Sequence, residues 1–226
     1  MPESLANPDQ GFFHTPAEGK ARARVLFLHG AGGPADTPWM DQVAAGLGDA
    51  GLNVYRAEFG YMAQRRTGGK KRPPPKAETL LSEVAGMIKH LPEPHLPLWL
   101  AGKSMGGRIA TMWAAQTAED QTEELKSEVI SHLAVPERVL VFGYPFHPPG
   151  KPDRLRIAHL PQASCPIHIL QGTRDPMGSQ SEVAELDLGD SVHITWVEDG
   201  NHDLRPRGLT RETVWPALVE QVSRLL

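Results

Sequence analysis

The sequence predicts an α/β fold in which a mainly parallel central sheet of about six or more strands carries helices on both faces. Six short runs of branched and aromatic residues are apolar almost throughout, which is typical of parallel strands that are covered on both sides. Segments with helical periodicity lie between several of these runs, and this alternation predicts right-handed strand–helix–strand crossovers. The predicted strands are residues 23–28, 52–59, 98–101, 138–142, 167–170 and 192–197.

The predicted helices show apolar residues spaced three to four positions apart. Four of them begin after Asp36, after the prolines at 73–75, at Ser104 and near Val214. Residues 118–133 are acidic with a narrow apolar stripe, which predicts a further helix on the surface.

The chain is expected to form one domain preceded by a short arm. Residues 1–20 contain three prolines and predict an irregular arm, with one short strand around residues 11–14. Residues 21–226 are expected to be a single domain without a cap, because a chain of 226 residues leaves no room for one. Prolines crowd the connection at residues 145–161, which predicts a short, stiff loop beside an open site.

The composition excludes several classes of protein. With 40% hydrophobic and 22% charged residues, the chain resembles ordinary globular proteins and is long enough to bury a core. A net charge of −4 argues against a nucleic-acid partner. Cys165 is the one cysteine, which excludes an internal disulfide framework and favours a reducing compartment. Since we find neither a signal peptide nor an apolar stretch of ~18 residues, we expect a cytoplasmic protein with no membrane partner.

The third predicted strand leads into Gly102-Lys103-Ser104-Met105-Gly106, which has the pattern G-x-S-x-G. In this pattern a sharp strand-to-helix turn holds the serine in a strained conformation with its hydroxyl exposed. The two glycines lack Cβ atoms, so the strand and the helix can approach each other closely. The pattern therefore predicts Ser104 as a nucleophile and the Met105 N–H as an oxyanion donor.

The same residues also match the end of a phosphate-binding loop, G-x-x-x-x-G-K-[ST]. That pattern needs a glycine at position 97, where this chain has Pro97, and a loop over residues 98–101, which we predict to be a strand. We therefore reject a phosphate-binding loop.

The first predicted inner strand ends in His29-Gly30-Ala31-Gly32-Gly33. A His-Gly pair followed by small residues fits the second half of an oxyanion hole, in which the Ala31 N–H is the expected donor. The alternative is a glycine-rich turn that binds no ligand.

An acid and a histidine follow the last two predicted strands. Asp175 lies just past one strand end, where a carboxylate can accept a hydrogen bond from an imidazole and fix its tautomer. His202 lies on the loop after the next strand. Taken alone, Asp-Pro is also a good turn former, and a loop histidine is usually solvated. If Asp175 is not the acid, Asp199 and Asp203 are the next candidates.

The chain order of Ser104, Asp175 and His202 matches the α/β-hydrolase arrangement, and the chain resembles this fold over residues 21–226. The motifs at 102–108, 143–150 and 172–175 resemble a family of small predicted hydrolases related to dienelactone hydrolases. The resemblance implies a serine hydrolase. Dienelactone hydrolases use a cysteine nucleophile, whereas this chain has a serine at that position.

Three other features bear on substrate choice. Residues 64–76 hold six basic side chains after a predicted strand, and they either recognise an anionic substrate or form a solvated loop. Phe146 and His147 either line an acyl pocket or pack their turn. Cys165 precedes a strand, far from the strand ends that carry chemistry, and is expected to be a buried packing residue.

These features predict a serine hydrolase that cleaves a carboxylic ester or related acyl bond of a small molecule, with no metal or organic cofactor. A peptidase or an acyltransferase with the same three residues is an alternative, as is a non-catalytic interaction module on the same fold. No feature of the sequence predicts an oligomeric state.

Overall fold

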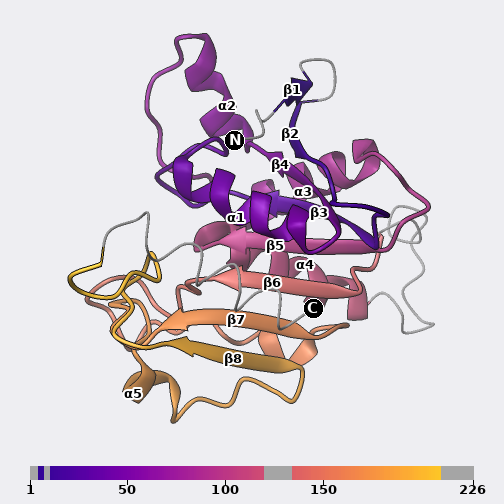
Figure 1. Cartoon of the computed structure of the whole chain (residues 1–226). Helices are drawn as coiled ribbons and strands as arrows, with labels where there is room; N and C mark the ends of the chain where they lie inside the picture. The colour runs from indigo at the N-terminus through magenta and orange to yellow at the C-terminus, as the bar shows by residue number, and fades with distance from the viewer. Residues whose placement is uncertain (1–4, 8–10, 120–133, 210–226) are drawn as a thin grey trace.

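The computed structural model describes residues 5–7, 11–119 and 134–209, and these form one mixed sheet of eight strands (Figure 1). The strand order is β1-β2-β4-β3-β5-β6-β7-β8. The six strands from β3 to β8 are mutually parallel, and β2 pairs antiparallel with β4. The strands are β1 (Leu5–Asn7), β2 (Phe12–Thr15), β3 (Ala23–Leu28), β4 (Leu52–Ala57), β5 (Leu98–Lys103), β6 (Arg138–Phe142), β7 (Ile167–Gly172) and β8 (Val192–Val197).

All six predicted strands are present as β3 to β8, so the predicted fold class is confirmed. β5 and β7 run further than expected, as far as Lys103 and Gly172. They do so because Lys103 still pairs with Phe142 in β6, and Gly172 with Val197 in β8. β4 ends earlier than expected, at Ala57.

The N-terminal arm is more regular than the sequence suggests. β2 lies where a short strand is predicted, and β1, which we did not expect, pairs antiparallel with it. Phe12 is buried, and its ring centroid lies 6.0 Å from that of Tyr55 in β4. This packing and the pairing with β4 attach the described part of the arm to the edge of the sheet.

Three of the described helices, α1, α3 and α4, lie where the sequence predicts helices, whereas the short α2 and α5 were not expected. α1 begins after Thr37, whose hydroxyl accepts a hydrogen bond from the Met40 N–H, and Pro38 occupies the first turn, where its missing N–H costs nothing. The helices expected near Val214 and over residues 120–133 lie outside the described residues. No helix in the described ranges is long and apolar enough to cross a membrane. The described helices are α1 (Pro38–Asp49), α2 (Gly60–Ala63), α3 (Ala77–His90), α4 (Met105–Glu119) and α5 (Gln180–Val183).

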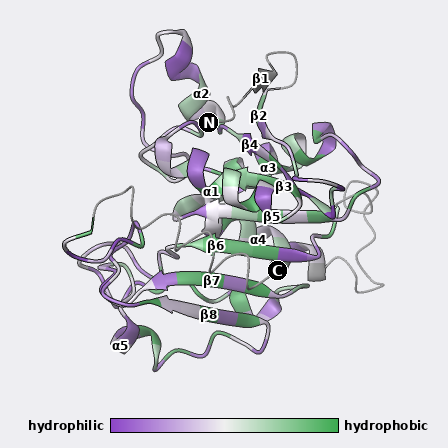
Figure 2. Ribbon diagram, in the orientation of Figure 1, coloured by the Kyte–Doolittle hydropathy of each residue, from purple (hydrophilic) through white to green (hydrophobic). Residues whose placement is uncertain are grey.

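The sheet has an apolar core on each face, which fixes where the helices pack. Val25 and Phe27 of β3 face the core shared with α1, whereas Leu26 and Leu28 face the core shared with α3 and α4. Successive strand residues point to opposite faces, so a strand buried on both sides must be apolar throughout. The green along β6 and the middle of β7 in Figure 2 marks this apolar character. The carboxyl ends of the parallel strands therefore meet at one edge of a rigid sheet.

Candidate active site

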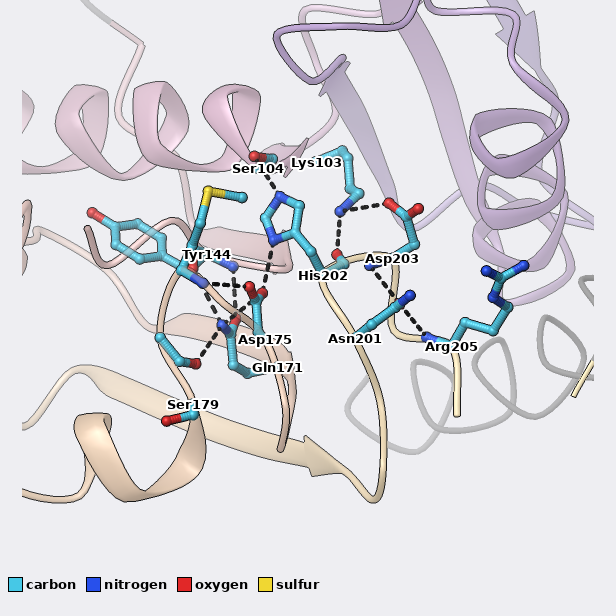
Figure 3. A network of polar contacts seen from close by, with 12 residues as sticks. Lys103, Ser104, Tyr144, Gln171, Asp175, Ser179, Asn201, His202, Asp203 and Arg205 are labelled. Atoms are coloured by element: carbon cyan, nitrogen blue, oxygen red, sulfur yellow. Dashed lines mark hydrogen bonds and ion pairs between the residues drawn. The ribbon is translucent and has the colours of Figure 1, made fainter. Parts of the chain in front are cut away.

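Ser104, His202 and Asp175 come together at this edge in one chain of hydrogen bonds (Figure 3). The Ser104 Oγ lies 2.8 Å from His202 Nε2, and His202 Nδ1 lies 2.7 Å from Asp175 Oδ2. Asp175 is fully buried, whereas the His202 side chain remains partly exposed. A carboxylate beside Nδ1 favours the tautomer in which Nε2 can accept a proton from the serine.

The backbone at Ser104 is held in the strained conformation that the sequence pattern predicts. Its φ is 51°, in the left-handed region that a serine rarely adopts. Its N–H donates to the Phe142 carbonyl at 3.0 Å, and its carbonyl accepts from the Arg108 N–H at 3.0 Å. A Cβ atom at Gly102 would lie 2.2 Å from the carbonyl carbon of Gly106, so only glycine allows this close approach.

Gln171 forms a hydrogen bond with Asp175, although no motif in the sequence points to it. Its Nε2 donates to Asp175 Oδ2 at 3.0 Å, and its Oε1 accepts from the Tyr144 N–H at 2.7 Å. The Met177 N–H donates to the other Asp175 oxygen at 2.9 Å. Gln171 is fully buried near the end of β7. A polar residue directly after the apolar pair Ile169-Leu170 was the available signal.

Lys103, also missed, holds the loop that carries His202. Its Nζ donates to the His202 carbonyl, lies 3.4 Å from Asp203 Oδ1, and sits 5.6 Å from the centroid of the Trp39 ring. Burial lowers the pKa of the Lys103 ammonium, and the charges of Asp203 and Asp175 oppose that shift.

The two alternative acids make other contacts. Asp199 pairs with Arg174 at 2.5 Å, and Asp203 pairs with Lys103. Within the described residues, Asp175 is the one carboxylate in contact with the His202 ring.

The glycine-rich turn after β3 lies beside Ser104 as expected. The Tyr61 hydroxyl donates to the Ala31 carbonyl at 3.0 Å. His29 is buried, with its Nε2 accepting from the Phe59 N–H at 3.1 Å and its Nδ1 2.7 Å from the Gly30 carbonyl. Burial lowers the pKa of His29, which favours the neutral ring that these contacts require. These contacts fix the peptide planes of the turn.

The N–H groups of Ala31 and Met105, which the sequence predicts to be oxyanion donors, have no protein acceptor in the described structure. Ala31 lines both of the cavities that meet at Ser104, and Met105 lines the second. Two unengaged backbone donors beside a nucleophile are what an oxyanion hole needs.

Two cavities meet at Ser104. The first, of about 400 Å³, has walls from the glycine-rich turn, the start of α1 and the His202 loop; it includes Trp39, Lys103, His202 and Arg205. The second, of about 370 Å³, lies on the side of α3 and α4. Its lining comprises Ala31, Pro74, Pro75, Ala77, Leu80, Ser104, Met105, Arg108, Ile109, Pro145, Arg156 and Met177.

Phe146 and His147, considered as lining of an acyl pocket, do not line either cavity. Both are buried: the Phe146 ring packs 4.8 Å from that of Tyr144, and His147 Nδ1 lies 2.9 Å from the Pro148 carbonyl. Gly178 leaves the space that Phe146 fills, since a Cβ there would lie 2.4 Å from the phenyl ring. The two side chains therefore pack their turn, and Pro145 lines the second cavity instead.

Two arginines of the basic segment 64–76 make contacts within the protein. Arg66 pairs with Glu58 at 2.7 Å and with Asp36 at 2.9 Å. Arg65 donates to the Arg72 carbonyl at 3.1 Å.

Cys165 is buried before β7, and burial raises the pKa of its thiol to about 11, which suits a packing residue.

Comparisons with known proteins agree with this architecture. A family model described as an alpha/beta hydrolase domain matches residues 21–226. The fold is similar to an alpha-beta serine hydrolase homologue from Coxiella burnetii, with 18% identity and a TM-score of 0.62 over 95% of this chain and 90% of that chain. It is also similar to Est1E from Butyrivibrio proteoclasticus, with 10% identity and a TM-score of 0.67 over 95% of this chain and 91% of that chain. A third similar structure is dienelactone hydrolase from Anabaena variabilis, with 21% identity and a TM-score of 0.61 over 93% of this chain and 88% of that chain.

At these identities the likeness to solved structures concerns the fold. No match was found among curated proteins. The family model covers nearly the whole chain and includes every residue of the site described above. The chain therefore belongs to the alpha/beta hydrolase domain family.

Proposed function

We propose that the protein is a serine hydrolase that cleaves a carboxylic ester or a related acyl bond through an acyl-enzyme intermediate. The observation that carries this proposal is the hydrogen-bonded chain from Asp175 through His202 to Ser104, whose hydroxyl lies where two cavities meet. Membership of the alpha/beta hydrolase family supports it.

In the first step the Ser104 Oγ attacks the carbonyl carbon of the substrate while His202 Nε2 takes its proton. The buried Asp175 carboxylate stabilises the imidazolium that forms. The N–H groups of Ala31 and Met105 bind the oxyanion of the tetrahedral intermediate, where one such donor is worth about 10²- to 10³-fold in rate.

The tetrahedral intermediate then collapses, and His202 gives its proton to the leaving group. The acyl group remains on Ser104 until a water, deprotonated by His202, attacks it. His202 then returns that proton to the Ser104 Oγ as the acid is released. Because the leaving group must lie near His202, we assign it to the first cavity, which His202 lines. The acyl group then lies in the second cavity, hereafter the acyl cavity.

A simple turnover assay tests the proposal. We expect the purified protein to hydrolyse 4-nitrophenyl hexanoate and Ser104→Ala to lower kcat by about 10⁴-fold or more. Ser82→Ala, at an exposed position on α3, is the matched control and is expected to leave kcat unchanged. Equal rates for the wild type and Ser104→Ala would contradict the proposal.

A further inference from the structure

Two arginines line the acyl cavity, and neither has a carboxylate partner among the residues that the structure describes. Arg108 lies in the first turn of α4, one helical turn after Ser104, and Arg156 lies in the connection after β6. No ion pair joins either guanidinium to an acid in the described ranges 5–7, 11–119 and 134–209. By contrast, Arg66 and Arg174, which lie outside this cavity, each pair with a carboxylate.

Within the described part of the chain, the groups around the two arginines do not neutralise their charge. The Arg108 Nε is buried and has no hydrogen-bond partner in the described structure. Burial is the main cause that lowers the pKa of Arg156, and the positive charges of Arg108 and Arg154 lower it further. Burial and the charge of Arg108 lower the pKa of His159 to about 4, so this ring is neutral at pH 7 and does not compensate the two positive charges.

Such an arrangement of positive charges costs free energy. Bringing like charges together in a partly dehydrated cavity is unfavourable unless an anion compensates them. The backbone holds Arg156 in place nonetheless: its N–H donates to the Phe146 carbonyl at 2.8 Å, and its carbonyl accepts from the Tyr144 hydroxyl at 2.7 Å. The Arg108 N–H is fixed by the Ser104 carbonyl at 3.0 Å. Both residues are therefore anchored at the cavity wall.

We propose that the acyl cavity binds a carboxylate at the far end of the acyl chain, so that the substrates are half-esters of small dicarboxylic acids. This inference rests on the proposed function. Guanidinium groups match a carboxylate in both charge and planar geometry. The other walls suit the hydrocarbon between the two ends of such an acyl group, because they are formed by Pro74, Pro75, Leu80, Ile109 and Met177.

Two esters of equal acyl length provide the test: mono-4-nitrophenyl adipate, which carries a free carboxylate, and 4-nitrophenyl hexanoate, which is neutral. For the wild type we expect kcat/KM to be about 10- to 100-fold higher for the adipate ester, the range of a hydrogen bond to a charged group. We expect Arg108→Gln and Arg156→Gln each to lower this ratio by about 10-fold or more, and Arg156→Lys to restore part of it. The matched control is Arg154→Gln, which removes an exposed arginine two positions away that does not line the cavity.

The outcomes separate this inference from the proposed function. A wild type that turns over both esters equally, or a ratio that survives both glutamine variants, overturns the carboxylate site while leaving the hydrolase intact. If neither ester is turned over, the proposed function fails, and calorimetric titration of Ser104→Ala with monomethyl adipate, which keeps one free carboxylate, and with neutral methyl hexanoate decides the site. Selective binding of monomethyl adipate that Arg156→Gln abolishes supports it, and no selective binding overturns it. Circular dichroism of each variant establishes that it is folded.

Discussion

The buried amide of Gln171 donates a 3.0 Å hydrogen bond to Asp175 Oδ2, the oxygen that also lies 2.7 Å from His202 Nδ1. The same amide group binds both the N–H and the carbonyl of Tyr144, at 2.7 and 3.2 Å. Gln171 thus joins the proposed catalytic acid to the turn that follows β6, although it does not line either cavity.

Gln171→Met retains the size of the side chain and removes these hydrogen bonds. We expect kcat to fall by about 10-fold with little change in KM, because Gln171 orients Asp175 without touching the substrate. The free energy of unfolding is expected to decrease by about 1–3 kcal/mol, since the buried Tyr144 N–H loses its acceptor. Steady-state kinetics and urea unfolding measure the two effects. A change in KM alone would refute a positioning role.

Asp175→Asn tests the identity of the acid. The amide can present its N–H to His202 and thereby stabilise the wrong tautomer, so we expect kcat to fall by about 10⁴-fold. Asp199→Asn is the matched control, because Asp199 pairs with Arg174 and not with His202. Turnover of 4-nitrophenyl hexanoate by both variants is the measurement. If Asp199→Asn were the inactive one, the acid would have to be reassigned.

Gly102 and Gly86 provide a matched pair of glycine-to-alanine substitutions. A Cβ at Gly102 meets backbone atoms at 2.2 Å, so Gly102→Ala is expected to destabilise the protein by about 3 kcal/mol or more. A Cβ at Gly86, inside α3, meets nothing within 4 Å. There alanine is the better helix former, and a gain of about 0.5–1 kcal/mol is expected. Urea unfolding of both variants checks the signs, and destabilisation of similar size in both would contradict the account.

His159 is expected to make stability depend on pH. Its pKa of about 4 in the folded protein is lower than the 6.5 of an ordinary histidine, mainly because of burial. The unfolded chain therefore binds more protons between pH 6.5 and 4, and the free energy of unfolding decreases as the pH falls through this window.

His159→Gln is expected to reduce this acid-induced loss by about 1 kcal/mol between pH 7 and 4.5, after allowance for partial exposure. Thermal or urea unfolding at the two pH values measures it. His95→Gln, at an exposed position, is the control and is expected to leave the pH dependence unchanged. If the free energy of unfolding depended on pH equally in the His159 variant and in the wild type, His159 would not be a half-buried, neutral histidine.

The strand-end residues were predictable because local chemistry and chain order agree. The positive φ of Ser104 and the close approach of the Gly106 backbone to Gly102 both follow from the G-x-S-x-G pattern. The first position requires a serine hydroxyl, and the second requires a residue without a Cβ atom. Asp175 and His202 follow neighbouring strands, so the topology brings them to the same edge.

Other parts of the site depend on tertiary contacts that leave no local pattern. Lys103 occupies a variable position of the G-x-S-x-G pattern. It contacts the loop that carries His202, which lies about 100 residues away in the sequence. Phe146 turns inward because Gly178 makes room for it. The pairing of β1 with β2 spans three residues, too few for a periodic signal. The joint placement of Arg108 and Arg156 likewise required the fold.

Covalent labelling of Ser104 tests the central claim most directly. A fluorophosphonate reacts with a serine that a histidine activates, so the wild-type protein is expected to carry one adduct, mapped by mass spectrometry to the peptide that contains Ser104. Ser104→Ala and His202→Ala are expected to abolish labelling. Labelling that persists in Ser104→Ala, or a wild type that does not react, would contradict the assignment of Ser104 as the nucleophile.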